Sequence, residues 1–468
     1  MSFSFTSSSG GHGSGTGSGR SGTGVRDMTQ GPILKQILIF AIPLMFGNLF
    51  QMLYNTVDSI VVGNFVSKQA LAAVGSTNMI INLLVFFFNG FSIGAGVIIG
   101  QRFGAKKTDE LHTAIETTML MTFIFCVLFT IIGVSYVNPM LRFMSTPEDV
   151  IPDAALYLRI YFSGISGLLI YNIGSGILRA VGNTTLPLLF LVLTSLMNIV
   201  LDLFFVVGLH MGIEGVAYAT ILSQFVSAGL TLMLLTGTKE IYRLSWRDLS
   251  IDRETAKQIF TVALPTGIQA VITSFSNIFV QAYINYFGSS CMAGWSCYNK
   301  LDQIMMLVIQ SVAMAVTTFV SQNIGAKKED RARQGTMSAL GLILTVNAVI
   351  AALLVFFSRQ AVSLFTKDES VISYGQLFIT TNTFFILFNA ANHALAGSMR
   401  GRGDSRGPMM AMLAAFVVFR QIYLFVLTRF ISNTPRPVGF SYPVGWMLCS
   451  CIMFTYYFRK YGGTKKPV

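Results

Sequence analysis

The chain has 468 residues, of which 53% are apolar and only 11% are charged, and its mean hydropathy is +0.63. A soluble protein carries about 25% charged residues, so most of this chain must be solvated by lipid. The net charge of +12 suggests a nucleic-acid partner, but the basic residues lie in short loops between apolar runs and form no continuous face, which excludes that class.

The N-terminal segment is rich in glycine and serine and lacks the apolar core of a signal peptide. We therefore expect residues 1–27 to form a disordered tail. Gly17, Gly19 and Gly22 match the pattern G-x-G-x-x-G. No strand precedes them and no βαβ unit follows, so this match reflects composition and does not indicate a dinucleotide site.

Twelve apolar runs follow, and each is long enough to cross the hydrocarbon core of a bilayer, which takes about 20 residues. Runs of this length satisfy their backbone groups in lipid as helices, so we predict an all-α integral membrane protein and exclude a β-barrel. The predicted spans are 34–60, 72–100, 114–136, 155–178, 187–208, 214–236, 258–286, 291–322, 335–357, 371–397, 408–430 and 439–458.

Lysine and arginine are concentrated in the connections that follow even-numbered spans, for example Lys106, Lys107, Lys327 and Lys328. Connections rich in these residues stay in the cytoplasm. We therefore expect a multi-pass protein of the inner (plasma) membrane with both termini in the cytoplasm.

The two halves of the chain repeat each other. QRFGAKK at 101–107 recurs as QNIGAKK at 322–328, and RAVGNTTLP at 179–187 recurs as RGRGDSRGP at 400–408, both at an offset of 221. Since each half has six spans, both insert the same way up, and we predict two six-helix lobes related by an axis along the membrane normal, around a central cavity. The predicted lobes are residues 28–236 and 258–460, with a cytoplasmic linker at 237–257 and a C-terminal tail at 461–468.

The repeated connectors that begin at Arg179 and Arg400 join the fourth and fifth spans of each half. We expect each arginine to hold the cytoplasmic side by its charge. Glycine followed by Asn or Asp is typical of a turn and a helix cap, and proline of the first turn of a helix. The connectors are therefore interpreted as structural, and the chemistry is sought elsewhere.

Acids inside the predicted spans are candidates for ion coupling, because a charge at the centre of a membrane helix costs about 2.5–3.5 kcal/mol on insertion scales. Asp58 lies late in the first span, and Asp202 in the fifth span follows Asn198 by one helical turn. The equivalent positions of the second half hold Val280 and Tyr423, so we assign cation handling to the first lobe.

Pro43 in the first span, LYNTVDSIVVG at 53–63, GAKK in both halves, LRAVGNTTLP at 178–187 and NIVLDLFFVVGLHMGIEGVAYAT at 198–220 can be compared with known families. Together they resemble the MATE family of multidrug and toxic compound extrusion transporters, and in the first half its DinF-like branch. The resemblance implies twelve helices in two bundles and cation-coupled export by alternating access.

The resemblance also implies roles for single residues. It makes Pro43 the proline at the bend of the first helix, and it implies a coupling site formed by Asp58, Asn172, Asn198, Asp202 and Thr220. The NorM branch uses acids of the seventh and tenth helices, where this chain has only amides, namely Asn277, Gln281, Asn285, Asn382, Asn389 and Asn392. This difference argues against a second-lobe site of the NorM type.

We hypothesise that Asp58 takes up a proton, or that Na⁺ binds to Asp58, Asn198, Asp202 and Thr220, whose oxygens are hard ligands. Pro43 would let the first span bend in response. No cofactor other than H⁺ or Na⁺ is expected. Phenylalanine and methionine suit promiscuous binding of lipophilic cations, although the same residues are ordinary on a lipid-facing surface. Expected substrate contacts are Gln51, Tyr54, Asn55, Asn277, Gln281 and Asn389.

Other function classes stay open. A flippase or exporter of lipid-linked saccharides, from the same fold superfamily, would need several inward-facing basic residues, for which Arg420 in the eleventh span is the one candidate. A membrane enzyme would need a cluster of acid, base or nucleophile, and a duplicated structural bundle would need no chemistry. The pattern G-x-x-x-x-G-K-[ST] is absent, so transport would use an ion gradient or a partner. We expect a monomer whose partners are drug-like small molecules and the lipid bilayer.

Overall fold

The structure is a computed structural model that describes residues 24–144 and 146–462. The terminal residues 1–23 and 463–468, which belong to the predicted tails, lie outside the described residues. Within the described part all regular structure is helical. The first half contains α1 (Ile33–Phe65), α2 (Lys68–Gly104), α3 (Thr108–Phe143), α4 (Ile151–Ser163), α5 (Ile165–Ala180), α6 (Thr185–Leu203), the π-helical segment Phe204–Gly208 and α7 (Ile213–Gly237).

The second half repeats this order with more interruptions. It contains α8 (Arg253–Asn285), α9 (Ser289–Gly325), α10 (Glu329–Phe356), α11 (Ser358–Ser363), α12 (Glu369–Asn382), a 3₁₀ turn (Thr383–Phe385), α13 (Ile386–Gly401), α14 (Arg406–Met412), α15 (Arg420–Val426), α16 (Pro435–Gly439) and α17 (Ser441–Tyr461), with π-helical segments Leu413–Phe419 and Leu427–Ile431 on either side of α15.

Eleven stretches of helix in the described residues are long and apolar enough to cross a membrane, and α4 with α5 makes a possible twelfth that is bent by 50°. The prediction of twelve spans is therefore confirmed up to this bend. The fourth span was expected to be one continuous run, but it breaks at Gly164. A side chain there would overlap Ile221 of α7, so glycine allows these helices to approach closely at the bend.

Many of the observed helices extend several residues beyond the predicted spans, into the polar residues that flank the apolar runs. In α3 the added first turn contains Asp109 and Glu110, whose charges complement the positive end of the helix dipole. In α8 the carboxylate of Asp252 accepts the backbone N–H of Thr255 at 2.8 Å. Apolar runs mark the part of a helix that can lie in lipid, and they do not mark where the helix ends.

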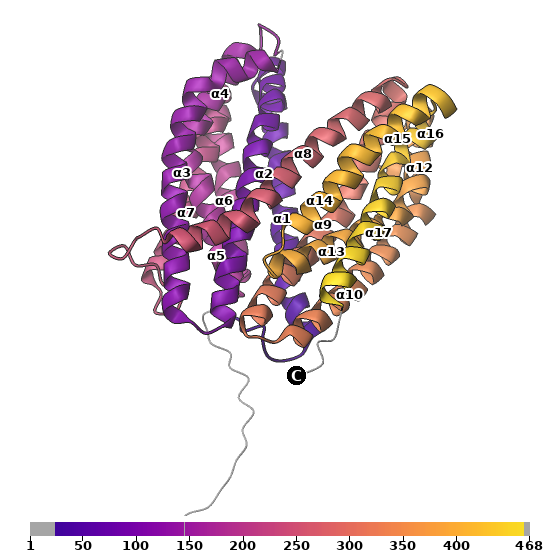
Figure 1. Ribbon diagram of the computed structural model, residues 1–468. Coiled ribbons are helices and arrows are strands. Elements are labelled where there is room, and N and C mark those ends of the chain that lie inside the picture. The colour runs from indigo at the N-terminus through magenta and orange to yellow at the C-terminus, as the bar shows by residue number, and fades with distance from the viewer. Residues whose placement is uncertain (1–23, 145, 463–468) are drawn as a thin grey trace, which may run out of the picture.

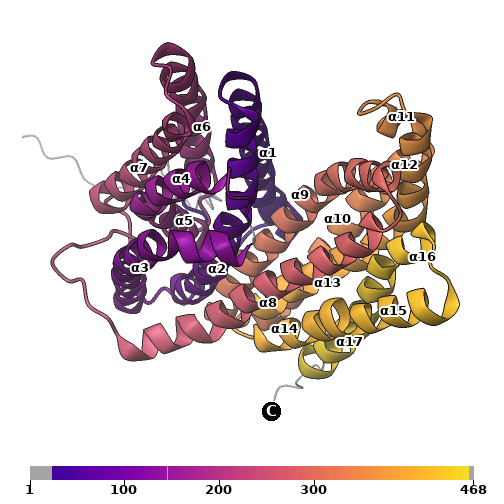
Figure 2. The ribbon, with the colours of Figure 1, turned by 90° about the horizontal axis from the view of Figure 1, so that it is seen from above.

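The helices form two lobes that lie side by side and diverge towards one end of the molecule (Figures 1 and 2). We call the opposite end, where α1 begins and α17 ends, the tail side. The lobes are not packed independently. Ile37 and Ala41 at the start of α1 belong to the apolar core of the second lobe, and Ile259 and Ala263 at the start of α8 belong to a core of the first lobe. The two halves thus exchange the first turns of their leading helices at an offset of 222.

The repeated connectors have the predicted geometry. Gly182 and Gly403 adopt positive φ angles of 85° and 86°, a conformation that favours glycine. The side chain of Asn183 accepts the N–H of Leu186 at 3.2 Å, and the carboxylate of Asp404 accepts the N–H of Gly407 at 3.1 Å. The interpretation of these connectors as turn and cap is confirmed.

The arginines of these connectors are not at the surface, contrary to expectation. Arg179 faces a cavity of the first lobe, and Arg400, only 9% exposed, donates to Oε1 of Gln269 at 3.2 Å. Arg179 lies in the last turn of α5 and Arg400 in the last turn of α13, so each side chain packs within its own lobe. These two side chains therefore do not act as surface charges.

Candidate functional site

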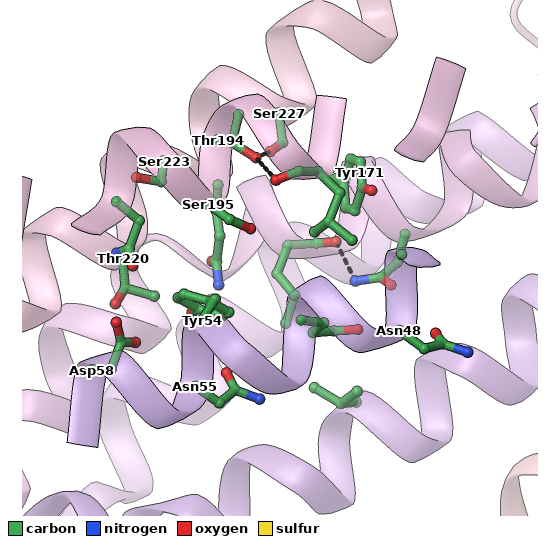
Figure 3. Close-up of a pocket in the computed structure, with 18 of the residues that line it drawn as sticks. Asn48, Tyr54, Asn55, Asp58, Tyr171, Thr194, Ser195, Thr220, Ser223 and Ser227 are labelled. Carbon is green, nitrogen blue, oxygen red and sulfur yellow. Dashed lines mark hydrogen bonds between the residues drawn. The ribbon is translucent and has the colours of Figure 1, made fainter. Parts of the chain in front are cut away.

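A cavity of about 420 Å³ lies in the first lobe, lined by α1, α2 and α4 to α7 (Figure 3). One face of α1 contributes Asn48, Gln51, Tyr54, Asn55 and Asp58, and each of these lies three or four residues from another of the set. This spacing places them on one side of a helix. The cavity therefore follows α1 for about 22 Å from Pro43 to Asp58, at 1.5 Å per residue.

Two acids meet at the far end of this cavity. Asp58 lines it from α1, and Asp202, which is 0% exposed, lies behind the wall near the end of α6. Their carboxyl groups are close enough to interact. Among the described residues, no hydrogen bond of ordinary geometry reaches Oδ1 of Asp58 or either carboxylate oxygen of Asp202, and neither acid forms an ion pair. Like charges placed this close without a basic partner repel each other, so a positive charge would be stabilised at this end of the cavity.

The remaining predicted coupling residues, from α5, α6 and α7, line the same cavity. Asn198 is 1% exposed, and neither its amide nitrogen nor its amide oxygen has a partner among the described residues. The Thr220 hydroxyl donates to the carbonyl of Val216 at 3.0 Å, which leaves its lone pairs for another donor or a cation. Asn172 donates to the carbonyl of Leu168 at 2.9 Å and lines the cavity from α5.

Several lining residues were missed in the sequence. Asn78, Asn82 and Asn89 of α2 face the cavity, and so do Tyr157 and Tyr161 of α4, whose rings stack at a centroid distance of 6.3 Å. The signal was present, because intervals of four and seven residues place side chains on one helix face. Attention to acids alone passed over these amides and phenols. The wall is consequently polar, with amide and phenol groups from α2 and α4 in addition to those of α1.

The predicted substrate contacts are divided between two places. Gln51, Tyr54 and Asn55 line the cavity of the first lobe. The second-lobe residues do not line it: Asn277 accepts from Arg420 at 2.8 Å, Gln281 donates to Asn285 at 2.7 Å, and Asn389 donates to the sulfur of Met306 at 3.4 Å.

Arg420, whose role the sequence left open, is 3% exposed and belongs to a packed network of the second lobe. Its guanidinium donates to the Ser276 hydroxyl at 2.7 Å and lies 4.7 Å from the ring centroid of Tyr442. A half-buried acid of the same lobe, Asp302 on α9, was not predicted from the sequence. The hydroxyl of Tyr298 donates to it at 3.5 Å.

Among the described residues, no three His, Cys, Asp or Glu side chains lie together in a way that could hold a metal ion. Any Na⁺ at Asp58 and Asp202 would thus need amide and hydroxyl oxygens, such as those of Asn198 and Thr220, to complete its shell. The residue types fit this requirement, and the Na⁺ site stays a prediction.

Comparison with known proteins agrees with the duplicated architecture. The MatE family model matches the chain twice, over residues 43–204 and 265–426. The probable multidrug resistance protein YoeA of Bacillus subtilis is 28% identical over 433 residues, which cover 91% of this chain and 93% of the relative. The probable multidrug resistance protein NorM of Thermotoga maritima is 26% identical over 418 residues, which cover 86% of this chain and 87% of the relative.

A solved structure described as the outward-facing conformation of a multidrug resistance MATE family transporter of the MOP superfamily has the same fold. Its TM-score is 0.87, at 23% identity, over 94% of this chain and 98% of that one. The family model covers more than half of the chain, once in each half. The chain is therefore an integral membrane protein of the MATE transporter family, built from two copies of the MatE unit.

Proposed function

We propose that this chain is a cation-coupled antiporter that exports lipophilic, often cationic compounds by alternating access. The observation that carries the proposal is a pair of acids, the half-buried Asp58 and the buried Asp202, at one end of a cavity large enough for a small organic molecule. Relatives named as multidrug resistance proteins support the same substrate class. An enzymatic role has no comparable support.

Competition for one negative region would couple the two fluxes. A cationic substrate and a coupling H⁺ or Na⁺ would both bind to the ionised carboxylates. Binding of either one would therefore require that the other has dissociated. An exchange of one for the other is then sufficient for antiport, and no cofactor beyond the coupling ion is required.

α1 would transmit the change. Asp58 lies in its second half, whereas Ile37 and Ala41 at its start are packed in the core of the second lobe. Pro43 lies between these parts in a continuous helix and supplies no backbone N–H to the ladder. Bending at this position would let one half of α1 follow the site while the other half moves the opposite lobe.

We propose that the tail side faces the cytoplasm of a cell with the protein in its inner (plasma) membrane. The basic residues Lys106, Lys107, Lys327 and Lys328 are exposed in the tail-side connections, which supports this orientation under the positive-inside rule. We expect the transporter to act as a monomer.

Export of lipid-linked saccharides is less well supported. An anionic lipid phosphate would favour several basic side chains in the cavity. Among the described residues that line it, Arg179 is the one lysine or arginine, and it lies at the end opposite Asp58.

Transport into sealed proteoliposomes tests the proposal, with a Na⁺ gradient and a pH gradient imposed separately on a fluorescent cationic substrate. One gradient should drive uphill transport by the wild type, and Asp58→Asn and Asp202→Asn should each reduce it to near the passive rate. Asp302→Asn is the matched control, because it removes a half-buried acid of the other lobe. Transport driven by neither gradient, or full coupling in both first-lobe variants, would refute the antiporter assignment.

A further inference from the structure

At the tail side the repeated segments around Gln101 and Gln322 pack directly against each other. A Cβ atom on Gly104 would lie 2.6 Å from the carbonyl carbon of Gln322, and a Cβ atom on Gly325 would lie 2.6 Å from the carbonyl carbon of Gln101. Both distances are far below an ordinary contact between carbon atoms, about 3.5–4.0 Å. Glycine at both positions therefore permits the two backbones, one from each lobe, to touch.

The two glutamines complete a contact that obeys the repeat. Gln101 donates its amide N–H to the carbonyl of Gly401 at 3.0 Å, and Gln322 donates to the carbonyl of Ala180 at 2.8 Å. Each bond crosses from one lobe to the other, and the two acceptors are themselves 221 positions apart. We call Gln101, Gly104, Gln322 and Gly325 the latch, since it holds the lobes together at the tail side.

Residues 24–31, which precede α1, cross this latch from the first lobe to the second along the lower edge of the molecule (Figure 1). On the first lobe, the N–H of Arg26 donates to the carbonyl of Val181 at 3.2 Å. On the second lobe, the N–H of Met28 donates to Oε1 of Gln322 at 2.9 Å, and the Met28 side chain is 0% exposed in that lobe's core. The segment is thus attached to both lobes.

Basic residues of the second lobe fix this segment further. One guanidinium nitrogen of Arg331 lies within reach of the carbonyls of Met28, Gln30 and Gly31, at 3.3, 2.9 and 2.7 Å. Lys328 donates to the carbonyl of Thr29 at 2.9 Å. Hydrogen bonds from charged donors are stronger than those between neutral groups, so the segment is held firmly on the second lobe.

We propose that residues 24–31 are a strap that locks the tail side closed through the latch, so that release of the strap controls how readily this side opens. Gln322 is the point where strap and latch meet, because its side-chain oxygen accepts from Met28 while its nitrogen donates to the first lobe. The lobes cannot part at the tail side unless the strap leaves one of them. The inference rests on the proposed alternating access, in which the tail side must open.

The repeat provides no second strap. The corresponding chain before α8 belongs to the linker and remains on the first lobe, where the N–H of Asp252 donates to the hydroxyl of Thr117 at 3.1 Å. The latch is therefore symmetric and the strap is not. Because the latch has two equivalent halves and the strap is single, one segment before α1 can control the opening of the tail side.

Distances between spin labels on the two lobes test the proposal in the full chain. Asp109→Cys and Asp330→Cys are exposed, repeat-related label sites at the tail side, and the exposed Cys451 is replaced by serine. Arg331→Gln should raise the ratio of tail-open to tail-closed molecules by about ten-fold, and the amide of Met28 should exchange its hydrogen faster by a similar factor. Lys328→Gln should shift both quantities in the same direction by less.

Arg333→Gln is the matched control, because this arginine lies two positions away on α10 and donates to the carbonyl of Gly462 instead. An equal change in the control, faster exchange of Met28 without longer distances, or no change in Arg331→Gln would each overturn the strap. These distances need no substrate and no gradient, so a failure of coupled transport would count against the proposed function and leave this result unaffected.

Discussion

The latch makes a quantitative prediction for its glycines. In Gly104→Ala the new methyl group would lie 2.6 and 2.8 Å from the carbonyl carbon and Cα of Gln322, about 1 Å closer than carbon atoms normally approach. The obstacle is backbone, so no change of side-chain rotamer relieves it. Overpacking of this kind costs about 1–3 kcal/mol, and the lobes can avoid it by separating at the tail side.

The expected shift follows from this energy. Each 1.4 kcal/mol is a factor of ten in an equilibrium constant, so Gly104→Ala should favour tail-open molecules by roughly 5- to 150-fold. Gly325→Ala meets the equivalent atoms of Gln101 at the same 2.6 and 2.8 Å and should act alike. A slight separation of the closed lobes that relieves one overlap also relieves the other. The free-energy change in the double variant should therefore be smaller than the sum of the two single changes.

Inter-lobe distances from spin labels at positions 109 and 330 measure the shift. Gly229→Ala in α7 and Gly341→Ala in α10 are matched controls, since a Cβ atom at either position meets nothing within 4 Å. Both should keep the wild-type distances and stabilise their helices slightly. Wild-type distances in Gly104→Ala and Gly325→Ala, with the protein folded, would show that the tail-side contact does not hold the lobes together.

Two further predictions concern the polar networks. Burial would raise the pKa of the Asp404 carboxyl, but hydrogen bonds donated by Lys460, by a backbone N–H and by two tyrosines outweigh it and hold the pKa below its usual range. This stabilisation is present above the unfolded-state pKa of about 3.9 and is lost as the pH falls through the lower folded value. Asp404→Asn should therefore lower the free energy of unfolding by about 2 kcal/mol near neutral pH and by much less in strong acid. Thermal unfolding scans at the two pH values measure the difference. In Arg420→Met, Asn277 loses its donor, while Ser276 keeps its bonds to Phe416 and Gln421. The midpoint of thermal unfolding should therefore fall by the equivalent of about 1–3 kcal/mol. An unchanged midpoint would mean that the arginine does not stabilise the second lobe.

Local features of this fold could be predicted from the sequence because they depend on a few neighbouring residues. The positive φ angles of Gly182 and Gly403 and the caps that follow them arise within single connectors, and the repeat shows each of them twice. The positions of Arg179 at a cavity and of Arg400 in the interior could not be predicted, since they depend on which helices pack around the connector. A charge in a loop looks the same in the sequence whether it faces water or its own lobe.

The candidate site shows the same division. Asp58 and Asp202 were identified because acids in apolar runs are rare, and Asn198 because it precedes Asp202 by one helical turn. Asp58 and Asn198 line one cavity, and Asp202 is buried behind its wall. The amides of α2 and the tyrosines of α4 were missed because each is individually ordinary in a membrane helix. Only the arrangement of six helices shows that they share a wall.

The two halves of the chain have kept their mechanics and lost the equivalence of their chemistry. Latch, connectors and exchanged first turns obey an offset of 221 or 222, and such contacts must match across an axis if two lobes are to close against each other. A cavity needs no such match, because the one in the first lobe is lined by the side chains of that lobe alone. Val280 could therefore replace an acid at the position equivalent to Asp58 without weakening closure. α1 is the element in which both requirements meet, since its start is fixed in the second lobe and its second half carries the acid of the first. Any change of charge at Asp58 is thus placed on the helix best able to move one lobe against the other.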